Sequence, residues 1–276
     1  MTSQQILGFS LVRGLGIRHG GQPVATIALC TASVAVFLVT HRLTRALAFT
    51  QGSLRFSALE GYSTFGPYIA DFHEARELLT GAFLQTDWWR IFTGAFLHID
   101  LRHLLFNMAV LFLLGRRLER FVGPYVLAGI YAVSLVGGSA GAMLHRPESA
   151  VVGASGAVYG VMGAAFVVEY LRGGNPWRDG LGSLIIINVA ISFLIPNISI
   201  GGHLGGLAAG VLAGFAIGDT SRRRHPPTLA ERLSNEPIDT RMRRSPVVVW
   251  ALLALIGAAA FVTALAAATT WRDPLF

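Results

Sequence analysis

The chain has 276 residues, of which 53% are hydrophobic and only 13% are charged, with a mean hydropathy of +0.56 and a net charge of +7. Soluble domains carry about 25% charged residues, so this composition excludes an ordinary soluble protein. In a soluble chain the positive charge would suggest nucleic acid. In an apolar chain it is better explained as a topology signal, and we expect no nucleic-acid partner.

Apolar runs of 16 to 24 residues recur along the chain, and such runs predict membrane-spanning helices. Several fall short of the roughly 20 residues that cross a typical hydrocarbon core, so local thinning of the bilayer is expected. The fold class predicted is an all-α polytopic membrane protein. Its seven predicted spans are about 24–40, 101–117, 125–144, 151–168, 181–196, 200–217 and 247–270.

The distribution of arginine predicts the orientation in the membrane. If the N-terminus lies inside and the chain crosses seven times, 14 of the 22 basic residues fall on the inner side. The cluster Arg222–Arg224 follows the sixth span directly. This bias predicts an inner N-terminus and an outer C-terminus. All basic residues are arginine, and with abundant Ala and Gly this suggests a bacterial inner membrane.

Four segments follow from this topology. Residues 1–23 form an inner tail, 24–218 a six-helix core, 219–246 a basic inner linker, and 247–276 a seventh helix with a short outer tail. Within the core, residues 41–97 form a long outer loop. We expect a short helix at Ala75–Leu84 in that loop, and the run Trp88-Trp89-Arg90 resembles an interfacial anchor with a snorkelling cation.

Three polar motifs each begin one of the predicted spans. They are His98–His103 with Asn107, Gly153–Gly156, and Gly202–Gly206. Polar groups cost several kcal/mol at membrane depth unless they are paired or used. Spans 2, 4 and 6 all run from outside to inside, so the three motifs lie at a similar depth near the outer face. A shared functional site is therefore possible.

The residue types at these positions suit acyl transfer. Helix N-termini present unpaired N–H groups that can stabilise an oxyanion. A serine nucleophile needs a base within hydrogen-bond reach, and His203 on a neighbouring helix could be the base for Ser155. Gly206 and Gly210 continue the face of His203 as a small-residue stripe that would permit close approach to span 4. Tyr159 lies one turn after Ser155, where it could contact the same imidazole.

Each motif also has a purely structural explanation. Gly153–Gly156 is a common packing sequence, a glycine-flanked histidine is often an interior hydrogen-bonding residue, and His103 with Asn107 could form an interhelical bond. Asn188 in span 5 is expected to make a packing hydrogen bond. Glu119, Glu169 and Arg172 are expected to be interfacial charges at inner span ends. Three such motifs at one depth on alternating helices would rarely coincide by chance.

Together the motifs resemble the rhomboid family of intramembrane serine proteases over roughly residues 24–218. The matching runs are Trp89-Arg90-Ile91-Phe92-Thr93, Leu97-His98 with His103 and Asn107, Gly153-Ala154-Ser155-Gly156-Ala157-Val158-Tyr159-Gly160, and Gly202-His203-Leu204-Gly205-Gly206. The resemblance implies a six-helix rhomboid-like bundle, here with a seventh C-terminal transmembrane helix as in some members. It implies membrane-protein substrates, and neither cofactor nor metal is expected.

The resemblance also implies a set of residue functions. Ser155 would be the nucleophile and His203 the general base, in a dyad without a third acidic member. Oxyanion donors would be His103 and Asn107, with the Ser155 backbone N–H. His98 would support the outer loop, Tyr159 would pack on the catalytic histidine, and the supporting glycines would be Gly153 and Gly206.

The expected function is cleavage of a peptide bond in or near the outer end of single-span transmembrane substrates in the lipid bilayer. One alternative is a non-catalytic rhomboid-like protein that binds membrane clients, which a serine-reactive fluorophosphonate probe would not label. Another is a transporter, which would place charged groups or broken helices near mid-membrane. The chain lacks a His-Glu-x-x-His zinc motif. No oligomeric state is predicted.

Overall fold

The structure is a computed structural model that describes residues 22–48, 88–146, 151–195, 198–218 and 245–269. Every secondary-structure element in these ranges is a helix, which confirms the all-α class. Two short elements, α4 (Arg90–Thr93) and the 3-10 helix η5 (Gly94–Phe96), precede the second predicted span. A long helix lies at each predicted span: α1 (Val24–Ala48), α5 (Leu101–Val122), α6 (Pro124–His145), α7 (Ser155–Leu171), α8 (Leu181–Leu194), α9 (Ile200–Ile217) and α11 (Pro246–Thr269).

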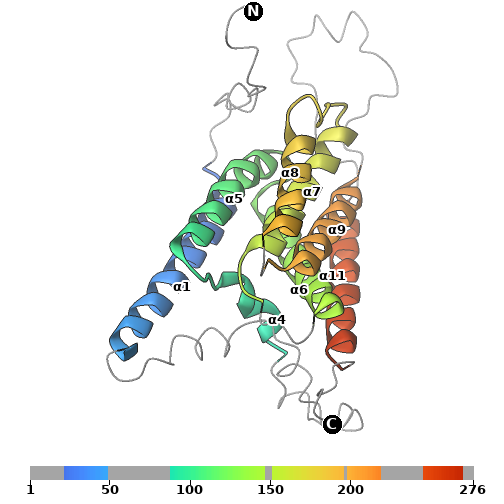
Figure 1. Ribbon diagram of the computed structural model, residues 1–276. Coiled ribbons are helices and arrows are strands. Elements are labelled where there is room, and N and C mark those ends of the chain that lie inside the picture. The colour runs from blue at the N-terminus through green and yellow to red at the C-terminus, as the bar shows by residue number, and fades with distance from the viewer. Residues whose placement is uncertain (1–21, 49–87, 147–150, 196–197, 219–244, 270–276) are drawn as a thin grey trace, which may run out of the picture.

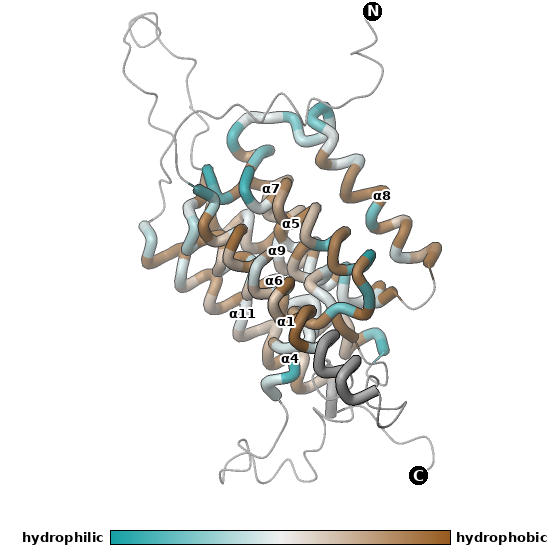
Figure 2. Tube along the Cα trace, turned by 90° about the vertical axis from the view of Figure 1, so that its left-hand side faces the viewer, coloured by the Kyte–Doolittle hydropathy of each residue, from teal (hydrophilic) through white to brown (hydrophobic). Residues whose placement is uncertain are grey.

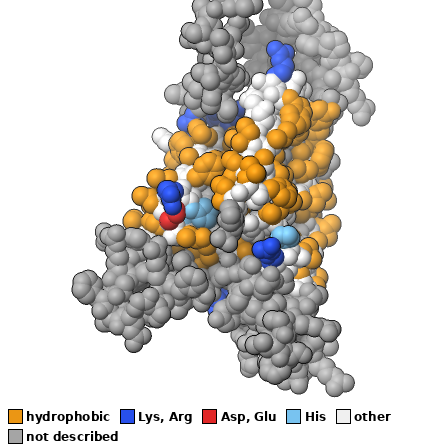
Figure 3. All heavy atoms as spheres, viewed as in Figure 1, with side chains coloured by type: hydrophobic (Ala, Val, Ile, Leu, Met, Phe, Trp, Pro, Cys, Tyr) orange, Lys and Arg blue, Asp and Glu red, His pale blue; other side chains and the backbone are white. Residues whose placement is uncertain are grey.

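The lengths and hydropathy of these helices fit an integral membrane protein. Three of them, α6, α9 and α11, are long and apolar enough to cross a membrane. The pair formed by residues 90–96 and α5 passes the same test together and is bent by 95°. The described part of α1, with α7 and α8, forms shorter apolar helices. Apolar residues dominate the helix middles (Figure 2) and cover much of the surface between charged ends (Figure 3).

The centre of the bundle is formed by α6, α7 and α9, which pack closely on one another. Helices α1 and α5 lie together on one side, and α11 packs along α6 on the other (Figure 1). Helix α8 contacts α7 and α9. Only Leu181, Gly182, Asn188 and Ser192 of its 14 residues are buried. The core is therefore a tight three-helix unit with α8 at its edge.

Glycine permits the close approach of α9 to α7. A Cβ atom on Gly206 would lie 2.6 Å from the carbonyl carbon of Gly156 and 2.9 Å from its Cα. A Cβ atom on Gly210 of α9 would meet the backbone of Gly160 of α7 in a similar way. The small-residue stripe expected on the sixth span does lie against the fourth. Such backbone contact is a common way for helices to associate in lipid, where apolar surface alone gives no driving force.

The expectation that Glu119 is an interfacial charge is wrong. Its side chain is buried at 5% exposure and caps the first turn of α1. The carboxylate accepts hydrogen bonds from the backbone N–H groups of Ala25 and Thr26, both at 2.9 Å, and from the Thr26 hydroxyl at 2.6 Å. These bonds satisfy donors that a helix start leaves without acceptors, so Glu119 joins α5 to α1.

The seventh helix is fixed to the bundle by aromatic contacts. A Cβ atom on Gly129 of α6 would lie 2.9 Å from the Trp250 ring of α11, so this ring lies flush against the α6 backbone. Phe261 of α11 stacks on Phe92 at 6.0 Å and meets Trp88 edge-on at 6.3 Å. Helix α11 therefore touches both α6 and the segment before η5.

Arg90 does not snorkel as its sequence context suggested. The residue is buried at 7% exposure, and its guanidinium lies 5.0 Å from the centre of the Trp89 ring. Other predictions fall outside the described residues: the short helix at Ala75–Leu84, the inner tail up to residue 21, and the basic linker between 219 and 244.

Candidate active site

The starts of three helices lie at the same end of the bundle, because α5, α7 and α9 alternate with α6 and α8 (Figure 1). Asp100 caps α5 by accepting a 2.8 Å hydrogen bond from the backbone N–H of His103. Ser199 caps α9 by accepting a 3.1 Å bond from the N–H of Gly202. Helix α7 begins at Ser155 itself. The first N–H groups of α7 therefore have no acceptor within their own helix.

Ser155 and His203 are in direct contact. The Oγ atom of Ser155 lies 2.7 Å from the Nε2 atom of His203, a strong hydrogen-bond distance. The imidazole is buried at 8% exposure and stacks on the Tyr159 ring, with centroids 4.1 Å apart and planes at 16°. A hydroxyl with a histidine nitrogen at this distance is the arrangement that activates a serine nucleophile.

The other imidazole nitrogen is bonded to a residue that the sequence analysis did not single out. The Nδ1 atom of His203 lies 2.7 Å from the Ser192 hydroxyl of α8. That hydroxyl is 2.8 Å from the Tyr159 hydroxyl, which donates to the Asn188 carbonyl at 2.6 Å. The Asn188 amide donates to the Leu184 carbonyl, a local packing bond as expected. The available signal was the i, i+4 spacing of Asn188 and Ser192, the two buried polar residues of α8.

His103 lies against the loop that leads into α7. A Cβ atom on Gly153 would be 2.6 Å from His103 Cε1 and 2.8 Å from Nε2, and Gly153 has a φ of +122°. Both the space and the backbone conformation therefore require glycine there. The N–H of Gly153 donates to the Gly94 carbonyl at 2.9 Å, and Asn107 donates to the His103 carbonyl at 3.1 Å. These contacts hold the His103 imidazole against Gly153, two residues before Ser155.

His98 supports His103 from the segment before α5. It is 2% exposed, its Nδ1 atom donates to the Phe96 carbonyl at 3.3 Å, and its ring lies 5.1 Å from the His103 ring. Burial and the neighbouring His103 lower the pKa of His98 to about 4, against the weaker opposing effect of the Phe96 carbonyl. The side chain is therefore neutral at pH 7. The backbone N–H of His103 lowers the pKa of the half-exposed Asp100 carboxyl by a different cause, because the donated hydrogen bond stabilises the carboxylate.

The predicted site residues thus form two adjoining groups. Ser155, His203 and Tyr159 meet between α7 and α9, where Gly206 brings the two helices together. His98, His103 and Gly153 meet beside the start of α7, with Asn107 one turn along α5. Within the described ranges, no three His, Cys, Asp or Glu side chains gather as metal ligands would.

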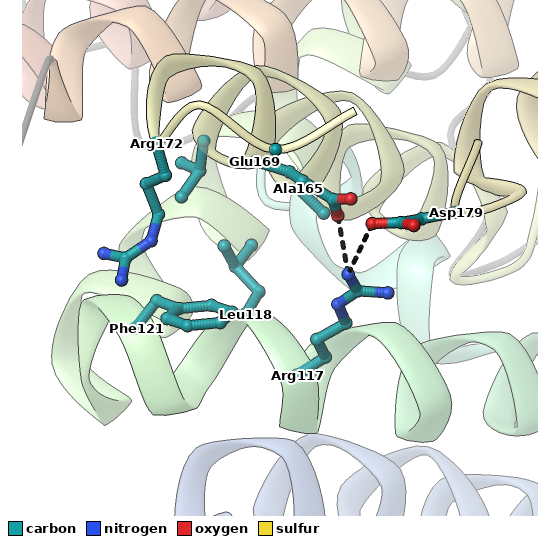
Figure 4. Close-up of a pocket in the computed structure, with 9 residues that line it drawn as sticks. Arg117, Leu118, Phe121, Ala165, Glu169, Arg172 and Asp179 are labelled. Carbon is teal, nitrogen blue, oxygen red and sulfur yellow. Dashed lines mark hydrogen bonds and ion pairs between the residues drawn. The ribbon is translucent and has the colours of Figure 1, made fainter. Parts of the chain in front are cut away.

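A charged cavity of about 250 Å³ lies at the other end of α7 (Figure 4). In it Arg117 bonds Glu169 at 2.9 Å and approaches Asp179 at 3.8 Å. The Arg172 guanidinium lies 4.4 Å from the Phe121 ring centre. Glu169 is 14 residues beyond Ser155 on one helix, or about 21 Å at 1.5 Å per residue. This cavity is therefore separate from the Ser155–His203 pair.

Comparisons with known proteins agree on one family. Residues 85–220 match the model of the Rhomboid domain. Putative rhomboid protease YdcA of Bacillus subtilis is 34% identical over 157 residues, covering 54% of this chain and 79% of that protein. Rhomboid protease GluP of Bacillus subtilis is 36% identical over 138 residues, covering 49% of this chain and 27% of that protein.

A more distant relative extends the comparison to eukaryotes. Rhomboid-type serine protease 2 of Emericella nidulans is 31% identical over 174 residues, covering 58% of this chain and 31% of that protein. The chain thus spans most of YdcA but under a third of GluP and of the Emericella protein. The matched segment contains α5, α6, α7, α8 and α9 and every predicted site residue. The chain therefore belongs to the rhomboid family, as an integral membrane protein.

Proposed function

We propose that this protein is an intramembrane serine endopeptidase in which Ser155 is the nucleophile and His203 the general base. The observation that carries the proposal is the 2.7 Å contact between Ser155 Oγ and His203 Nε2. It joins two helices at the ends where their polar motifs lie. A half-buried serine hydroxyl on a buried imidazole, beside unpaired helix N–H groups, is the combination that acyl transfer to serine requires.

In this mechanism Ser155 Oγ attacks the scissile carbonyl carbon while its proton moves to His203 Nε2. The carbonyl π electrons move to oxygen and form the oxyanion of a tetrahedral intermediate. The imidazolium then gives the same proton to the departing amide nitrogen, leaving an ester on Ser155. A water molecule attacks that ester with His203 again as the base, which frees the acid product and restores the serine hydroxyl.

The oxyanion would be stabilised by groups at the start of α7. The Ser155 N–H is directed out of the first helical turn, and His103 lies against Gly153, two residues earlier. The Asn107 amide has a second N–H besides the one given to His103. Removing one such donor costs about 2.7–4 kcal/mol in a measured case. His103→Ala or Asn107→Ala should therefore lower turnover by about a hundredfold or more.

Substrate access favours cleavage near the outer end of a single-span substrate. A membrane helix satisfies its own backbone hydrogen bonds, and freeing one in hydrocarbon costs several kcal/mol. The scissile segment must therefore unwind, which is easiest near a helix end and at poor helix formers such as glycine. Leucine in place of those residues should slow cleavage while the substrate still inserts.

The proposal includes a bacterial inner membrane location with the N-terminus inside and the C-terminus outside. Its support is the arginine bias, with Arg116, Arg117 and Arg120 at the end of α5 opposite to His103. In a Cys30→Ala background, cysteines at Asn235→Cys and Leu275→Cys should react from the inner and outer side respectively. Labelling of position 235 from outside intact cells would overturn this orientation.

The decisive experiment compares the wild type with Ser155→Ala and His203→Ala in liposomes with a model single-span substrate. Both substitutions should abolish cleavage while leaving the helical content unchanged, because residues that act as one unit lose function together. Ser183→Ala, an exposed serine on α8, is the matched control and should cleave like the wild type. Cleavage by purified Ser155→Ala, or no fluorophosphonate labelling of Ser155 in the wild type, would overturn the proposal.

A further inference from the structure

The second imidazole nitrogen of the proposed base is held by a helix other than the one that carries it. We propose that Ser192 of α8 is a positioning residue, which accepts the Nδ1–H of His203 and so makes the base competent only when α8 is seated against the core. The inference rests on the proposed function of Ser155 and His203. The juxtaposition that carries it is the 2.7 Å contact between His203 Nδ1 and the buried Ser192 hydroxyl.

The hydrogen-bond donors and acceptors allow one consistent assignment in the active state. Nε2 must accept the Ser155 proton, so the ring hydrogen must sit on Nδ1, which makes Ser192 Oγ the acceptor. The Ser192 hydroxyl then donates onward to the Asn188 carbonyl at 2.9 Å or to the Tyr159 oxygen at 2.8 Å. Tyr159 donates to the Asn188 carbonyl. The chain of bonds therefore ends at a backbone oxygen and leaves none of these hydroxyls without a partner.

This assignment gives a hydroxyl the place that a carboxylate takes in serine proteases with an acidic third residue. The Ser192 hydroxyl orients the ring and stabilises the imidazolium, whose Nδ1–H becomes a charged donor when Nε2 takes the proton. It does so with a dipole rather than a full charge, which avoids burying a carboxylate at membrane depth. Hydrogen bonds to charged groups are stronger than neutral ones, so the bond contributes most in the transition state.

The bond also links the base to α8, a helix at the edge of the core with only four buried residues. The exposed face of α8 includes Ile186, Ile187, Phe193 and Leu194, each at 55% exposure or more. Its buried polar face consists of Asn188 and Ser192, the two residues that meet Tyr159 and His203. Moving α8 outward would break three bonds to the site together. The orientation of His203 is thereby coupled to the position of α8.

The test is kinetic, with a second readout that does not depend on the substrate. Ser192→Ala should lower kcat/KM for a single-span substrate by about ten- to a hundredfold, through kcat and with KM unchanged. It should slow fluorophosphonate labelling of Ser155 by a similar factor, since that reaction needs the base but no substrate helix. Ser192→Thr keeps the hydroxyl and should restore most of the rate. Ser183→Ala on the same helix is the control and should match the wild type.

The pH dependence separates positioning from a structural effect. Without the Ser192 acceptor the imidazolium is less stable, so the acid limb of the kcat/KM profile should move to lower pH as the plateau falls. A merely loosened protein would lose rate without that shift. Equal rates for Ser192→Ala and the wild type, with Ser155→Ala inactive, would overturn this inference and leave the proposed function intact. An inactive wild type would instead overturn the proposed function.

A measurement on the wild type avoids the risk that a buried substitution prevents folding. The ¹⁵N chemical shifts of the His203 ring, assigned by their loss in His203→Gln, report which nitrogen carries hydrogen. Protonated Nδ1 with unprotonated Nε2 at pH 7 is expected. Hydrogen on Nε2 instead would make Ser192 the donor and would overturn the inference.

Discussion

The contact between Gly206 and Gly156 predicts a large effect from the smallest possible side chain. In Gly206→Ala, the new Cβ would lie 2.6 Å from the Gly156 carbonyl carbon. Carbon atoms in contact are ordinarily 3.5–4.0 Å apart, so α9 must move away from α7 by about 1 Å. The obstacle is backbone, which cannot rotate aside as the end of a side chain could.

That displacement acts directly on the proposed catalytic pair, because Gly206 lies one turn after His203 on the same helix. Adding about 1 Å to the 2.7 Å separation of Ser155 Oγ and His203 Nε2 takes it beyond hydrogen-bond reach. A misplacement of about 1 Å can cost about a hundredfold in rate. We therefore expect kcat/KM to fall about a hundredfold. Overpacking should also lower the free energy of unfolding by about 1–3 kcal/mol.

The assay measures cleavage of a single-span substrate in liposomes and the rate of fluorophosphonate labelling, with the unfolding midpoint as a third value. Gly257→Ala in α11 is the matched control, because its Cβ would meet only Val133 Cγ2, at an ordinary 3.6 Å. The control should keep full activity. If Gly206→Ala cleaves within threefold of the wild type, the reasoning that backbone contact sets the position of His203 is refuted.

Three further predictions concern stability. Glu119→Gln places an amide N–H against the Thr26 donors and should lower the free energy of unfolding in SDS by about 2–3 kcal/mol. The control Arg102→Gln breaks the ion pair with Asp100, in which the side chains are 93% and 42% exposed, and should leave that free energy unchanged within error. Because burial lowers the pKa of His98 from 6.5 to about 4, its contribution to the free energy of unfolding should be fully present above pH 6.5 and fall by about 3 kcal/mol towards pH 4. His98→Gln should therefore lose less stability than the wild type between pH 6.5 and pH 4, and equal losses would contradict the neutral assignment. A chain ending at Asp219 loses the contacts of Trp250 and Phe261 and should therefore unfold at a lower temperature. Below that temperature the fluorophosphonate probe should still label Ser155, because α11 contributes no residue to the site; a folded truncated chain that is not labelled would refute this.

Hydropathy located the helices because membrane spans are continuous apolar runs. The predicted limits agree with α6, α9 and α11 within one residue. The predicted first span ends at 40, before the charged residues that follow it, whereas α1 continues to Ala48. Charge marks the edge of the hydrocarbon, and a helix does not have to end there. The site motifs were found because serine, histidine and asparagine are costly in apolar segments.

The two polar contacts that the sequence analysis missed depend on long-range packing. Glu119 meets a residue 93 positions away, which no local pattern reveals. Ser192 lies in an apolar run where a lone serine ordinarily bonds its own helix, as this one also does through the Asn188 carbonyl. Its second contact depends on the placement of α8 beside α9. Local patterns specify which residues need partners, and the packing of the helices determines which partners they have.

The glycine contacts among α6, α7 and α9 have a further consequence for the heat capacity of the protein. Surfaces that part inside a bilayer become exposed to lipid and not to water, so separating these helices hydrates little apolar area. Hydration of apolar area is the origin of the large positive heat-capacity change in soluble proteins, and of the curvature of their stability with temperature. Helix separation within the bilayer should therefore have a small heat-capacity change. The stability of this core should decline almost linearly on warming and show no loss in the cold.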